Sequence, residues 1–472
     1  MAPARDSAAG LPVAPSLEPT LVRDAIARPP AIMDRRDAVI CALAVALAVV
    51  ATGVAEVLVR AIALITNLAY YGQVSLTSVS PAGNRLGTFA VLVPIGGAII
   101  VGLMARYGSR AIRGHGIPEA MEQILTNESR IPLRITFLKP ASSAIAIGTG
   151  GPFGAEGPII ATGGALGSAL GQVIAMTSTE RKTLLAAGAA AGMTAIFGTP
   201  VAGILLAIDL LLFEYRPRSA VPVALACAMA GGLHVLIHGS DACFKMAALA
   251  PPNIATLAVS TIVGGVIGAV STLVTRLVYW IEDRFEHLPI HWMWWPALGA
   301  VAVGVVGLVA PRTLGVGYDN IEAALAGNLG AVALAMLIAA KLVSWSVALG
   351  SGTSGGTLAP LLTLGSGLGW LLVAGAAAVA PSLGIDPRIG ALVGMAAMFA
   401  GASRAMLASI AFAIEATHQI DATAPVVAGV SLAYFASCML MRTTIMTEKL
   451  MRRGVHVPHE LDALEPTTAR AR

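Results

Sequence analysis

One carboxylate occupies an unusual position in this sequence. Residues 148–158 read Gly-Thr-Gly-Gly-Pro-Phe-Gly-Ala-Glu-Gly-Pro, and a strongly hydrophobic run follows directly. Glu156 therefore lies on a glycine-rich turn at the expected start of an apolar helix. The first N–H groups of a helix lack partners within the helix and carry positive partial charge, so an anion binds there readily. A carboxylate fixed at that point would compete with a free anion, which is the behaviour of a gate.

The composition indicates that this helix lies in a membrane. Of 472 residues, 56% are hydrophobic and only 12% are charged, and the mean hydropathy is +0.79. Soluble proteins carry about 25% charged residues. Residues 246–275 and 342–385 contain no charged side chain, and a membrane crossing needs about 20 residues. The 51 glycines fit closely packed and broken helices that line a cavity.

The expected position of Glu156 at membrane depth supports a functional role for this residue. A charged side chain there costs about 2.5–3.5 kcal/mol or more, so its presence indicates a functional site. The alternative is an acidic residue that only stabilises a helix N-terminus, a contribution of about 0.3–1 kcal/mol. The glycine-rich surroundings favour the gate.

The ends of the chain are expected on the cytoplasmic side of the membrane. The first 35 residues are polar and rich in proline, without a cleavable signal peptide, and Arg35 and Arg36 precede the first apolar run. Residues 448–454 are also basic, and basic flanks favour the cytoplasm. The expected organisation is a cytoplasmic N-terminal tail at 1–35, a single membrane transport domain at 36–455 and a polar C-terminal tail at 456–472.

Several classes of function are disfavoured. The net charge is +4, but arginine is spread among loops, so no nucleic-acid partner is expected. The four cysteines lack metal-ligand spacing, and no metal or other cofactor is expected. An intramembrane hydrolase using Glu156 and His115 would need a metal cluster or a water-activating pair, and the sequence contains no His-Glu-x-x-His constellation. The protein is therefore not expected to be an enzyme.

The chain contains an internal repeat. Glycine, leucine and proline recur at equal spacing in two segments, Gly154-Ala-Glu-Gly-Pro158 with Gly163 and Leu166-Gly167, and Gly356-Thr-Leu-Ala-Pro360 with Gly365 and Leu368-Gly369. Two weaker matches flank this one in the same order, Gly114-His-Gly116 with Gly315-Val-Gly317, and Ala207-Ile-Asp209 with Ala413-Ile-Glu415. Two halves with Gly/Pro-interrupted helices at corresponding positions are typical of transporters whose site lies between the halves.

We therefore expect an all-α, polytopic membrane protein made of two inverted-topology helical repeats with broken, tilted helices. The halves are placed near residues 36–220 and 250–450, with 239–252 as the connector.

Three motifs in this order resemble those of the CLC chloride channels and proton-coupled chloride exchangers: Gly114-His-Gly-Ile-Pro-Glu119, Gly154-Ala-Glu-Gly-Pro158 and Gly355-Gly-Thr-Leu-Ala-Pro360. The resemblance covers almost all of residues 36–455. It implies a homodimer in the lipid bilayer, an anion pathway in each subunit formed by converging helix N-termini, inverted repeats and cytoplasmic termini. Because the chain ends at Arg472, cytoplasmic nucleotide-binding modules are expected to be missing, as in prokaryotic relatives, and the expected location is a bacterial inner (plasma) membrane.

The resemblance also implies roles for residues of the first half. Glu156 matches the gating glutamate, which blocks the anion site when deprotonated and, on protonation, swings away, admits chloride and moves a proton. Lys139 lies upstream, where relatives also have a basic residue. His115 stands where relatives have a serine that contacts chloride, beside the backbone amides of Gly116 and Ile117. Since histidine donates an N–H and titrates near neutral pH, His115 could bind chloride or carry a proton, or its ring could point elsewhere.

In the second half, two further positions match chloride-binding positions of the family. Thr357 and Leu358 match the loop whose backbone N–H groups bind chloride, with Leu358 where phenylalanine is usual. Met446 aligns with a tyrosine whose hydroxyl contacts chloride in relatives, and a thioether cannot donate a hydrogen bond. The usual serine and tyrosine are thus both replaced, and backbone amides are expected to be the main donors.

The inner proton-carrying glutamate of the exchangers has two candidate positions. Aligned on the glycine-rich start of its helix, it falls on Leu210, which is apolar as in channel members; aligned on Arg216-Pro217, it falls on Glu214. These two residues are four positions apart, so a continuous helix would place them on one face. Glu214 could instead be a surface carboxylate paired with Arg216 or Arg218. Asp209 is expected to be a structural, hydrogen-bonded helix residue.

The sequence favours chloride transport by a chloride/proton exchanger gated by Glu156. A passive chloride channel is the alternative, because Leu210 stands in one alignment of the inner glutamate.

Overall fold

The computed structural model describes residues 33–457, and this part of the chain is built from helices without a β-strand. The first half contains α2 (Arg35–Thr66), α3 (Leu92–Tyr107), α4 (Ile117–Thr126), α5 (Leu133–Gly148), α6 (Glu156–Val173), α7 (Ser178–Phe197), α8 (Pro200–Ala207) and α9 (Pro217–His238). The second half contains α10 (Ile254–Glu286), α11 (Trp295–Val309), α12 (Tyr318–Leu325), α13 (Ala331–Gly350), α14 (Leu358–Val379), α15 (Pro387–Ser403), α16 (Met406–Thr417), α17 (Thr423–Leu440) and α18 (Glu448–Arg452). The predicted tails at 1–35 and 456–472 fall almost entirely outside the described residues.

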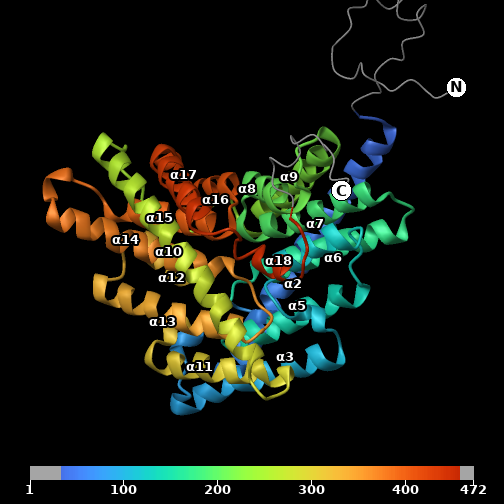
Figure 1. Cartoon of the computed structure of the whole chain (residues 1–472), viewed down its shortest axis with the longest axis horizontal. Coiled ribbons are helices and arrows are strands. Elements are labelled where there is room, and N and C mark those ends of the chain that lie inside the picture. The colour runs from blue at the N-terminus through green and yellow to red at the C-terminus, as the bar shows by residue number, and fades with distance from the viewer. Residues whose placement is uncertain (1–32, 458–472) are drawn as a thin grey trace, which may run out of the picture.

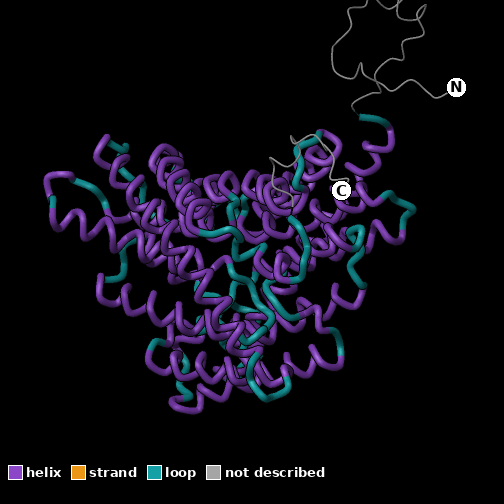
Figure 2. The backbone as a smooth tube through the Cα atoms, in the orientation of Figure 1, coloured by secondary structure: helices purple, strands orange, loops and turns teal. Residues whose placement is uncertain are grey.

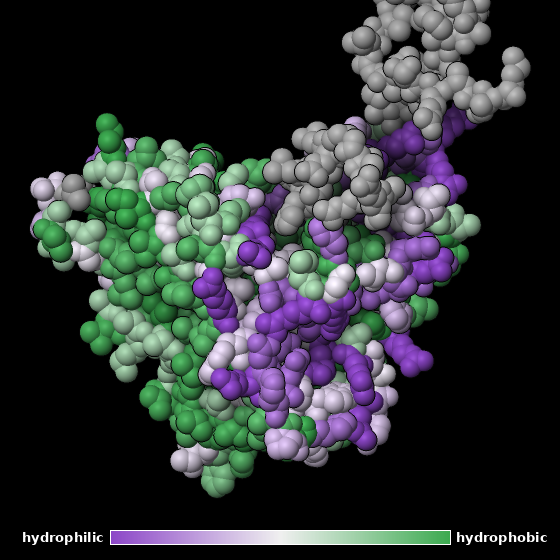
Figure 3. Space-filling view, in the orientation of Figure 1, coloured by the Kyte–Doolittle hydropathy of each residue, from purple (hydrophilic) through white to green (hydrophobic). Residues whose placement is uncertain are grey.

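The two halves lie beside each other and meet in the centre of the molecule. In Figure 1, α5, α6 and α7 occupy the right of the view and α13, α14 and α15 the left. Within residues 33–457, 8 helical segments are long and apolar enough to cross a membrane. Figure 3 shows a broad hydrophobic surface interrupted by one hydrophilic band. The predicted all-α, polytopic membrane protein is therefore confirmed.

The boundary that the sequence predicted near residue 220 falls within a helix. Pro217 begins α9, which runs on to His238. Proline fits the first turn of a helix because its missing N–H would have no partner there. The Arg216-Pro217 pair therefore starts a helix of the first half, and the non-helical connector follows it.

Glycines bring neighbouring helices into backbone contact at equivalent places in the two halves. A Cβ added to Gly163 on α6 would overlap the carbonyl oxygen of Gly188 on α7. A Cβ added to Gly365 on α14 would likewise overlap the carbonyl oxygen of Gly394 on α15. The repeated glycines of the sequence thus mark the tightest helix packing, as small residues do in membrane proteins.

Asp209 and Glu415, the acidic residues at corresponding places in the repeat, each accept hydrogen bonds from the other half. Glu415 on α16 accepts hydrogen bonds from the N–H groups of Val201 (3.0 Å) and Ala202 (2.8 Å), at the start of α8. Asp209, which follows α8, accepts one from the N–H of Ala408 (3.4 Å), near the start of α16. Each half therefore caps a helix of the other half, and the structural role predicted for Asp209 is confirmed.

The predicted continuous helix across Leu210 and Glu214 is wrong. After α8 the chain forms one π-helical turn, Ile208–Leu212, and Phe213 then adopts the left-handed conformation with φ of 54°. A residue with positive φ ends a right-handed helix. Leu210 and Glu214 consequently do not share a helix face.

The glycine contacts can be tested with alanine variants of α14. Gly365→Ala should lower the free energy of unfolding by about 1–3 kcal/mol, because neither backbone can move aside cheaply. Gly375→Ala in the same helix meets no heavy atom within 4 Å and should be neutral or stabilising by up to about 1 kcal/mol. Thermal unfolding of the detergent-purified variants measures both changes. Equal unfolding temperatures for the two variants would contradict this packing.

Candidate functional site

Three helices begin inside the protein. The first residues of α4, α6 and α14, which are Ile117, Glu156 and Leu358, are 2%, 1% and 1% exposed. Glu119 caps α4 by accepting a hydrogen bond of 2.6 Å from the N–H of Gly116. No side chain caps α6 or α14. Their first N–H groups therefore bring positive partial charge into the interior.

Backbone hydrogen bonds join the loops that precede these helices. The N–H of Gly154 donates to the carbonyl of Gly356 (3.2 Å), and the N–H of Gly356 donates to the carbonyl of Gly154 (3.0 Å). Gly114 forms a parallel bridge with Ser354 through hydrogen bonds of 3.4 Å. Figure 2 shows such loops among the helices in the centre of the molecule. Since Gly154 and Gly356 are equivalent in the repeat, their antiparallel pairing is the contact expected of inverted repeats.

Only glycine fits where these loops meet the helices. A Cβ at Gly157 would overlap the carbonyl oxygen of His115, and a Cβ at Gly116 would overlap that of Gly157. Gly116 also has a φ of 101°, a conformation that costs little only for glycine. The loop before α4 therefore contacts the first turn of α6 directly.

Glu156 is held at one oxygen and free at the other. The hydroxyl of Tyr318 donates a hydrogen bond of 2.9 Å to Oε1, whereas Oε2 is buried without a hydrogen-bond partner in the described structure. The carboxylate folds back over Gly154, where an added Cβ would overlap Oε2. A buried carboxylate with an unpaired oxygen is costly, so this conformation favours release or protonation.

Two cavities approach this region. The larger, of about 530 Å³, is lined by Gly116 and Lys139 among others. The smaller, of about 280 Å³, is lined by Ala155 and Tyr318 and also by Ile147. Lys139 and Ile147 lie about 12 Å apart along α5 at about 1.5 Å per residue. The smaller cavity therefore reaches the residues next to Glu156, and the larger one reaches Gly116 and Ala161 in the second turn of α6.

Two buried lysines support the two Gly-x-Gly loops in the same way. Lys139 Nζ donates to the carbonyls of Ile112 and Gly114, both at 2.8 Å. Lys341 Nζ donates to the carbonyls of Thr313 (3.1 Å) and Gly315 (3.2 Å). Both side chains are almost fully buried, at 1% and 0% exposed. The lysines thus anchor the loops that lead into α4 and α12.

Aromatic rings surround the tyrosine that holds Glu156. The ring centroid of Tyr318 lies 5.7 Å from Phe197 and 6.1 Å from Phe244, in edge-to-face geometry. Phe412 packs edge-on against Phe197 at 5.0 Å. Such pairs contribute about 0.5–1.5 kcal/mol each beyond their buried area, so the position of the Tyr318 hydroxyl is well defined.

His115, Thr357 and Leu358, which the sequence predicted as anion-binding residues, lie in this region, and His115 has a ring nitrogen without a described hydrogen bond. His115 is 5% exposed, and its Nδ1 is buried without a hydrogen-bond partner. Thr357 and Leu358 are buried at the start of α14, beside the Gly154–Gly356 bridge. Nδ1 of His115 therefore remains available for a hydrogen bond, because no other described residue bonds to it.

Met446 is fully buried, and its segment is fixed by the backbone. The N–H of Ile445 donates to the carbonyl of Ala402 (3.0 Å), and the hydroxyl of Tyr279 donates to the carbonyl of Ile445 (2.9 Å). Lys449 then links α18 to the cap of α4 through an ion pair of 3.7 Å with Glu119. The C-terminal segment is thereby tied to the loop that carries His115.

Glu214 has cationic partners. Its carboxylate forms ion pairs with Lys182 (3.6 Å) and Arg216 (3.3 Å) and accepts a hydrogen bond from the hydroxyl of Ser219 (3.2 Å). Arg218, the other partner considered, forms an ion pair with Asp37 (3.4 Å). Leu210 is 4% exposed. This arrangement matches the surface-carboxylate alternative for Glu214.

Tyr318 and Lys341 were missed by reasoning from the sequence. Tyr318 directly follows the weak repeat match at Gly315-Val-Gly317 and stands opposite Ile117, whereas Lys341 lies on α13 and contacts the carbonyl of Gly315. Extending that match would have suggested a residue at the start of a helix near Glu156, although not its hydrogen bond. Among residues 33–457, no group of three or more His, Cys, Asp or Glu side chains could hold a metal ion.

Comparisons with known proteins agree on one family. A family model described as "Voltage gated chloride channel" matches residues 96–438. The H(+)/Cl(-) exchange transporter ClcA of Vibrio vulnificus (strain YJ016) is 31% identical over 360 residues, which cover 74% of this chain and 76% of that protein. Chloride channel protein CLC-f of Arabidopsis thaliana is 30% identical over 375 residues, which cover 73% of this chain and 46% of that protein.

Solved structures share the fold. A slow cyanobacterial Cl−/H+ antiporter superposes with a TM-score of 0.77 at 22% identity, covering 87% of this chain and 97% of that one. A CLC-type fluoride/proton antiporter superposes with a TM-score of 0.69 at 20% identity, covering 85% of this chain and 95% of that one.

The buried lysines can be tested by removing their charge. Lys341→Met should lower the free energy of unfolding by about 1–3 kcal/mol, because two buried carbonyls lose their donor. Lys139→Met should behave similarly. Lys245→Met is the control, since this lysine is exposed and forms only an i,i+4 ion pair with Asp241, and such pairs contribute about 0–1 kcal/mol. An unchanged unfolding temperature for Lys341→Met would show that the lysine does not anchor the loop.

Proposed function

This chain belongs to the CLC family of chloride channels and chloride/proton exchangers, and we propose that it exchanges chloride for protons across the membrane, with Glu156 as the gate. The main support is the state of Glu156, which is buried at the start of α6 with one oxygen bonded to Tyr318 and the other unbonded. The ClcA relative is named as an H(+)/Cl(-) exchange transporter. The fold neighbour is titled a Cl−/H+ antiporter.

In this proposal chloride binds among the buried helix starts. The uncapped N–H groups of Thr357 and Leu358 are the main donors in the second half, and those of Gly116 and Ile117 contribute from the first. His115 adds its unpaired Nδ1 as an N–H donor in the tautomer that carries hydrogen there. Met446 supplies an apolar wall at the place of the usual tyrosine.

Protonation couples the gate to chloride. Deprotonated Glu156 occupies the region that its own helix N-terminus makes positive, and so excludes chloride electrostatically. A proton neutralises the carboxylate, weakens its hold on the N–H groups and Tyr318, and lets chloride take its place. Each swing of the neutral side chain then carries one proton. His115 is a second group on the proton route.

The remaining features follow the family. Two copies form a homodimer, for which exposed apolar residues of helices α8, α9, α16 and α17 offer a surface, among them Val201, Leu225, Leu407 and Val427. Residues 36–455 act as a single transport domain. The protein lies in a bacterial inner membrane with both termini in the cytoplasm.

A passive chloride channel is the second candidate. Leu210 is buried at one aligned position of the inner glutamate, and Glu214 at the other is ion-paired with Lys182 and Arg216. Neither arrangement offers an obvious inner proton carrier. The hydrolase hypothesis has no support among the relatives described, which are named as transporters and channels.

The exchanger is tested with purified protein in liposomes that contain a chloride gradient, while chloride efflux and external pH are recorded together. We expect chloride to drive protons uphill. Glu156→Gln and Glu156→Ala should abolish this proton movement and leave chloride movement, because neither side chain can carry a proton. Proton flux that persists in either variant would refute the gate assignment, and chloride efflux without protons in the native protein would identify a channel.

The inner carrier is tested with Glu214→Gln in the same assay. A loss of proton movement with retained chloride efflux would make Glu214 the inner relay. Since Glu214 is ion-paired at the surface, we expect proton movement to continue.

The bond to Tyr318 is tested with Tyr318→Phe. A hydrogen bond to a charged group contributes about 1.5–3 kcal/mol, and about 1.4 kcal/mol corresponds to a factor of ten. The variant should therefore release Glu156 more readily and raise chloride flux roughly tenfold. Tyr71→Phe is the control, because the Tyr71 hydroxyl donates to the carbonyl of Ser80 (2.6 Å) and not to Glu156. Equal flux in native protein and Tyr318→Phe would mean that the hydroxyl does not restrain the gate.

A further inference from the structure

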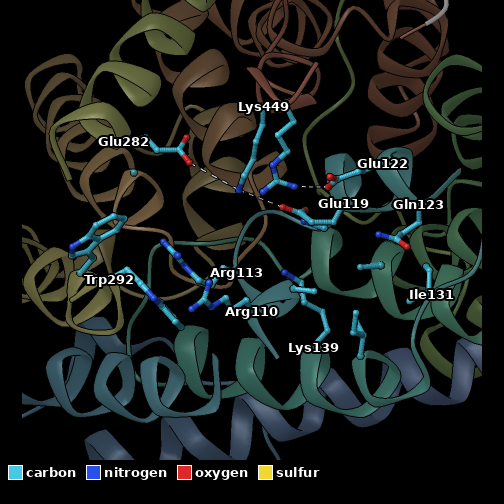
Figure 4. A pocket seen from close by; sticks show the side chains of 18 of the residues that line it. Arg110, Arg113, Glu119, Glu122, Gln123, Ile131, Lys139, Glu282, Trp292 and Lys449 are labelled. Atoms are coloured by element: carbon cyan, nitrogen blue, oxygen red, sulfur yellow. Dashed lines mark hydrogen bonds and ion pairs between the residues drawn. The ribbon is translucent and has the colours of Figure 1, made fainter. Parts of the chain in front are cut away.

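The larger cavity has a charged wall that the proposed chloride site does not use. It has a volume of about 530 Å³ and is lined by residues of α4, α5, α10 and α18 and by the segments around Arg110 and Trp292. Figure 4 shows side chains of both signs around it, with Glu119 and Lys449 on one side and Arg110, Arg113 and Trp292 on the other.

The carboxylates of this cavity are largely paired with lysine and arginine from the C-terminal segment. Lys449 lies 3.7 Å from Glu119 and 4.0 Å from Glu282. Arg453 forms an ion pair of 2.5 Å with Glu122. The acidic groups near α4 are therefore already neutralised within the protein.

Arg110 and Arg113 differ from Lys449 and Arg453. In the described part of the chain, neither has a carboxylate within 4.0 Å. Both guanidinium groups lie against the indole of Trp292, with Cζ 4.8 Å and 5.1 Å from its centroid. Arg113 also donates to the carbonyl of Gly352 (3.3 Å) and lies 5.5 Å from the ring centroid of Trp295.

Two like charges thus lie near one indole ring at a cavity, and neither has a described carboxylate within 4.0 Å. Arg113 is attracted by the charges of Glu282 and Glu286 and repelled by that of Arg110. Each cation–π contact contributes only about 0.5–1 kcal/mol at an exposed site. Glu282 and Glu286 line the same cavity but do not reach either guanidinium within 4.0 Å. An anion bound between Arg110 and Arg113 would supply a negative charge in direct contact with both.

The geometry of the side chains selects the kind of anion. A guanidinium presents a planar fork of N–H groups that matches two oxygens of one oxyanion, whereas a spherical halide cannot use both prongs in this way. Two such forks match a doubly charged, tetrahedral group. We propose that Arg110 and Arg113 form a binding site for the phosphate group of a small molecule.

The size of the cavity indicates what carries the phosphate. Cavities of about 300–1,000 Å³ hold ligands larger than a single phosphate ion, and the volume of about 530 Å³ falls in this range. The same cavity extends to Gly116 and Lys139, beside the loop of His115. A bound organic phosphate therefore obstructs the approach of chloride from this side, a consequence that rests on the proposed function, whereas the binding itself does not.

Binding is tested first by isothermal titration calorimetry of the full chain in detergent, with inorganic phosphate and with AMP as probes. The double variant Arg110→Gln/Arg113→Gln should weaken phosphate binding roughly tenfold or more, because two charge-assisted forks are lost. Arg106→Gln is the matched control. Arg106 stacks on Tyr107 with Cζ 5.7 Å from the ring centroid, but it does not line the cavity. The affinity of the Arg106→Gln variant for phosphate should equal that of the native protein.

Further variants guard against misfolding. Arg110→Gln alone changes an exposed side chain whose described contact is Trp292, and it should still weaken phosphate binding. Arg113→Lys keeps the charge but removes the fork, and it should weaken binding of phosphate as well. Tighter binding of AMP than of inorganic phosphate would identify an organic phosphate as the ligand, and equal affinities would identify free phosphate. The proposal is wrong if neither probe binds the native protein, or if the double variant binds as well as the native one.

A transport measurement tests the obstruction separately. Phosphate or AMP on the side of this cavity should slow chloride efflux from liposomes in the native protein and in Arg106→Gln, but not in the double variant. Equal slowing in all three would refute the obstruction at this site. If chloride does not move in any of them, the proposed function fails, while the calorimetric result still decides whether the phosphate site exists.

Discussion

The antiparallel pair of hydrogen bonds between Gly154 and Gly356 is the constraint on which this structure depends. It fixes the loops before α6 and α14, so that two uncapped helix starts are buried near each other. Positive partial charge from both helices then accumulates in a region shielded from water, where electrostatic effects are strong. The third loop joins through Gly114 and Ser354. A carboxylate or an anion is the natural counter-charge for such a region, and Glu156 supplies the first of these.

The two halves agree in what supports the site and differ in what performs the chemistry. Lys139 and Lys341 hold equivalent loops, and Asp209 and Glu415 exchange caps between the halves. The side chains of the proposed site are unlike in each case: Glu156 is opposite Leu358, His115 is opposite Val316, and Tyr318 is opposite Ile117. A duplicated scaffold therefore carries a site that is not symmetric. This asymmetry leaves a single carboxylate at the two uncapped helix starts, the one that we propose as the gate.

Much of the fold and part of the site could be predicted from the sequence, because they rest on glycine, proline and hydrophobic spacing. The repeat at Gly154 and Gly356 predicted that these loops correspond, and the structure joins them directly. The bond from Tyr318 to Glu156 could not be predicted, since it links residues far apart in the chain through a side-chain orientation. The error at Leu210 and Glu214 has a local cause: spacing by four implies a shared face only on a continuous helix, and the left-handed conformation of Phe213 is not visible in the order of residues.

The connector between the halves has a consequence for how such a protein can arise. Phe244 lies in this segment, donates its N–H to Ala416 (2.8 Å) and packs near Tyr318 and Phe412. The aromatic cluster around Tyr318 thus contains a residue that belongs to neither repeat. Two separate copies of one ancestral half would reproduce the paired glycines and lysines but would lack this ring. The segment that joins the halves is therefore more than a linker, because it supplies a ring that packs against Tyr318.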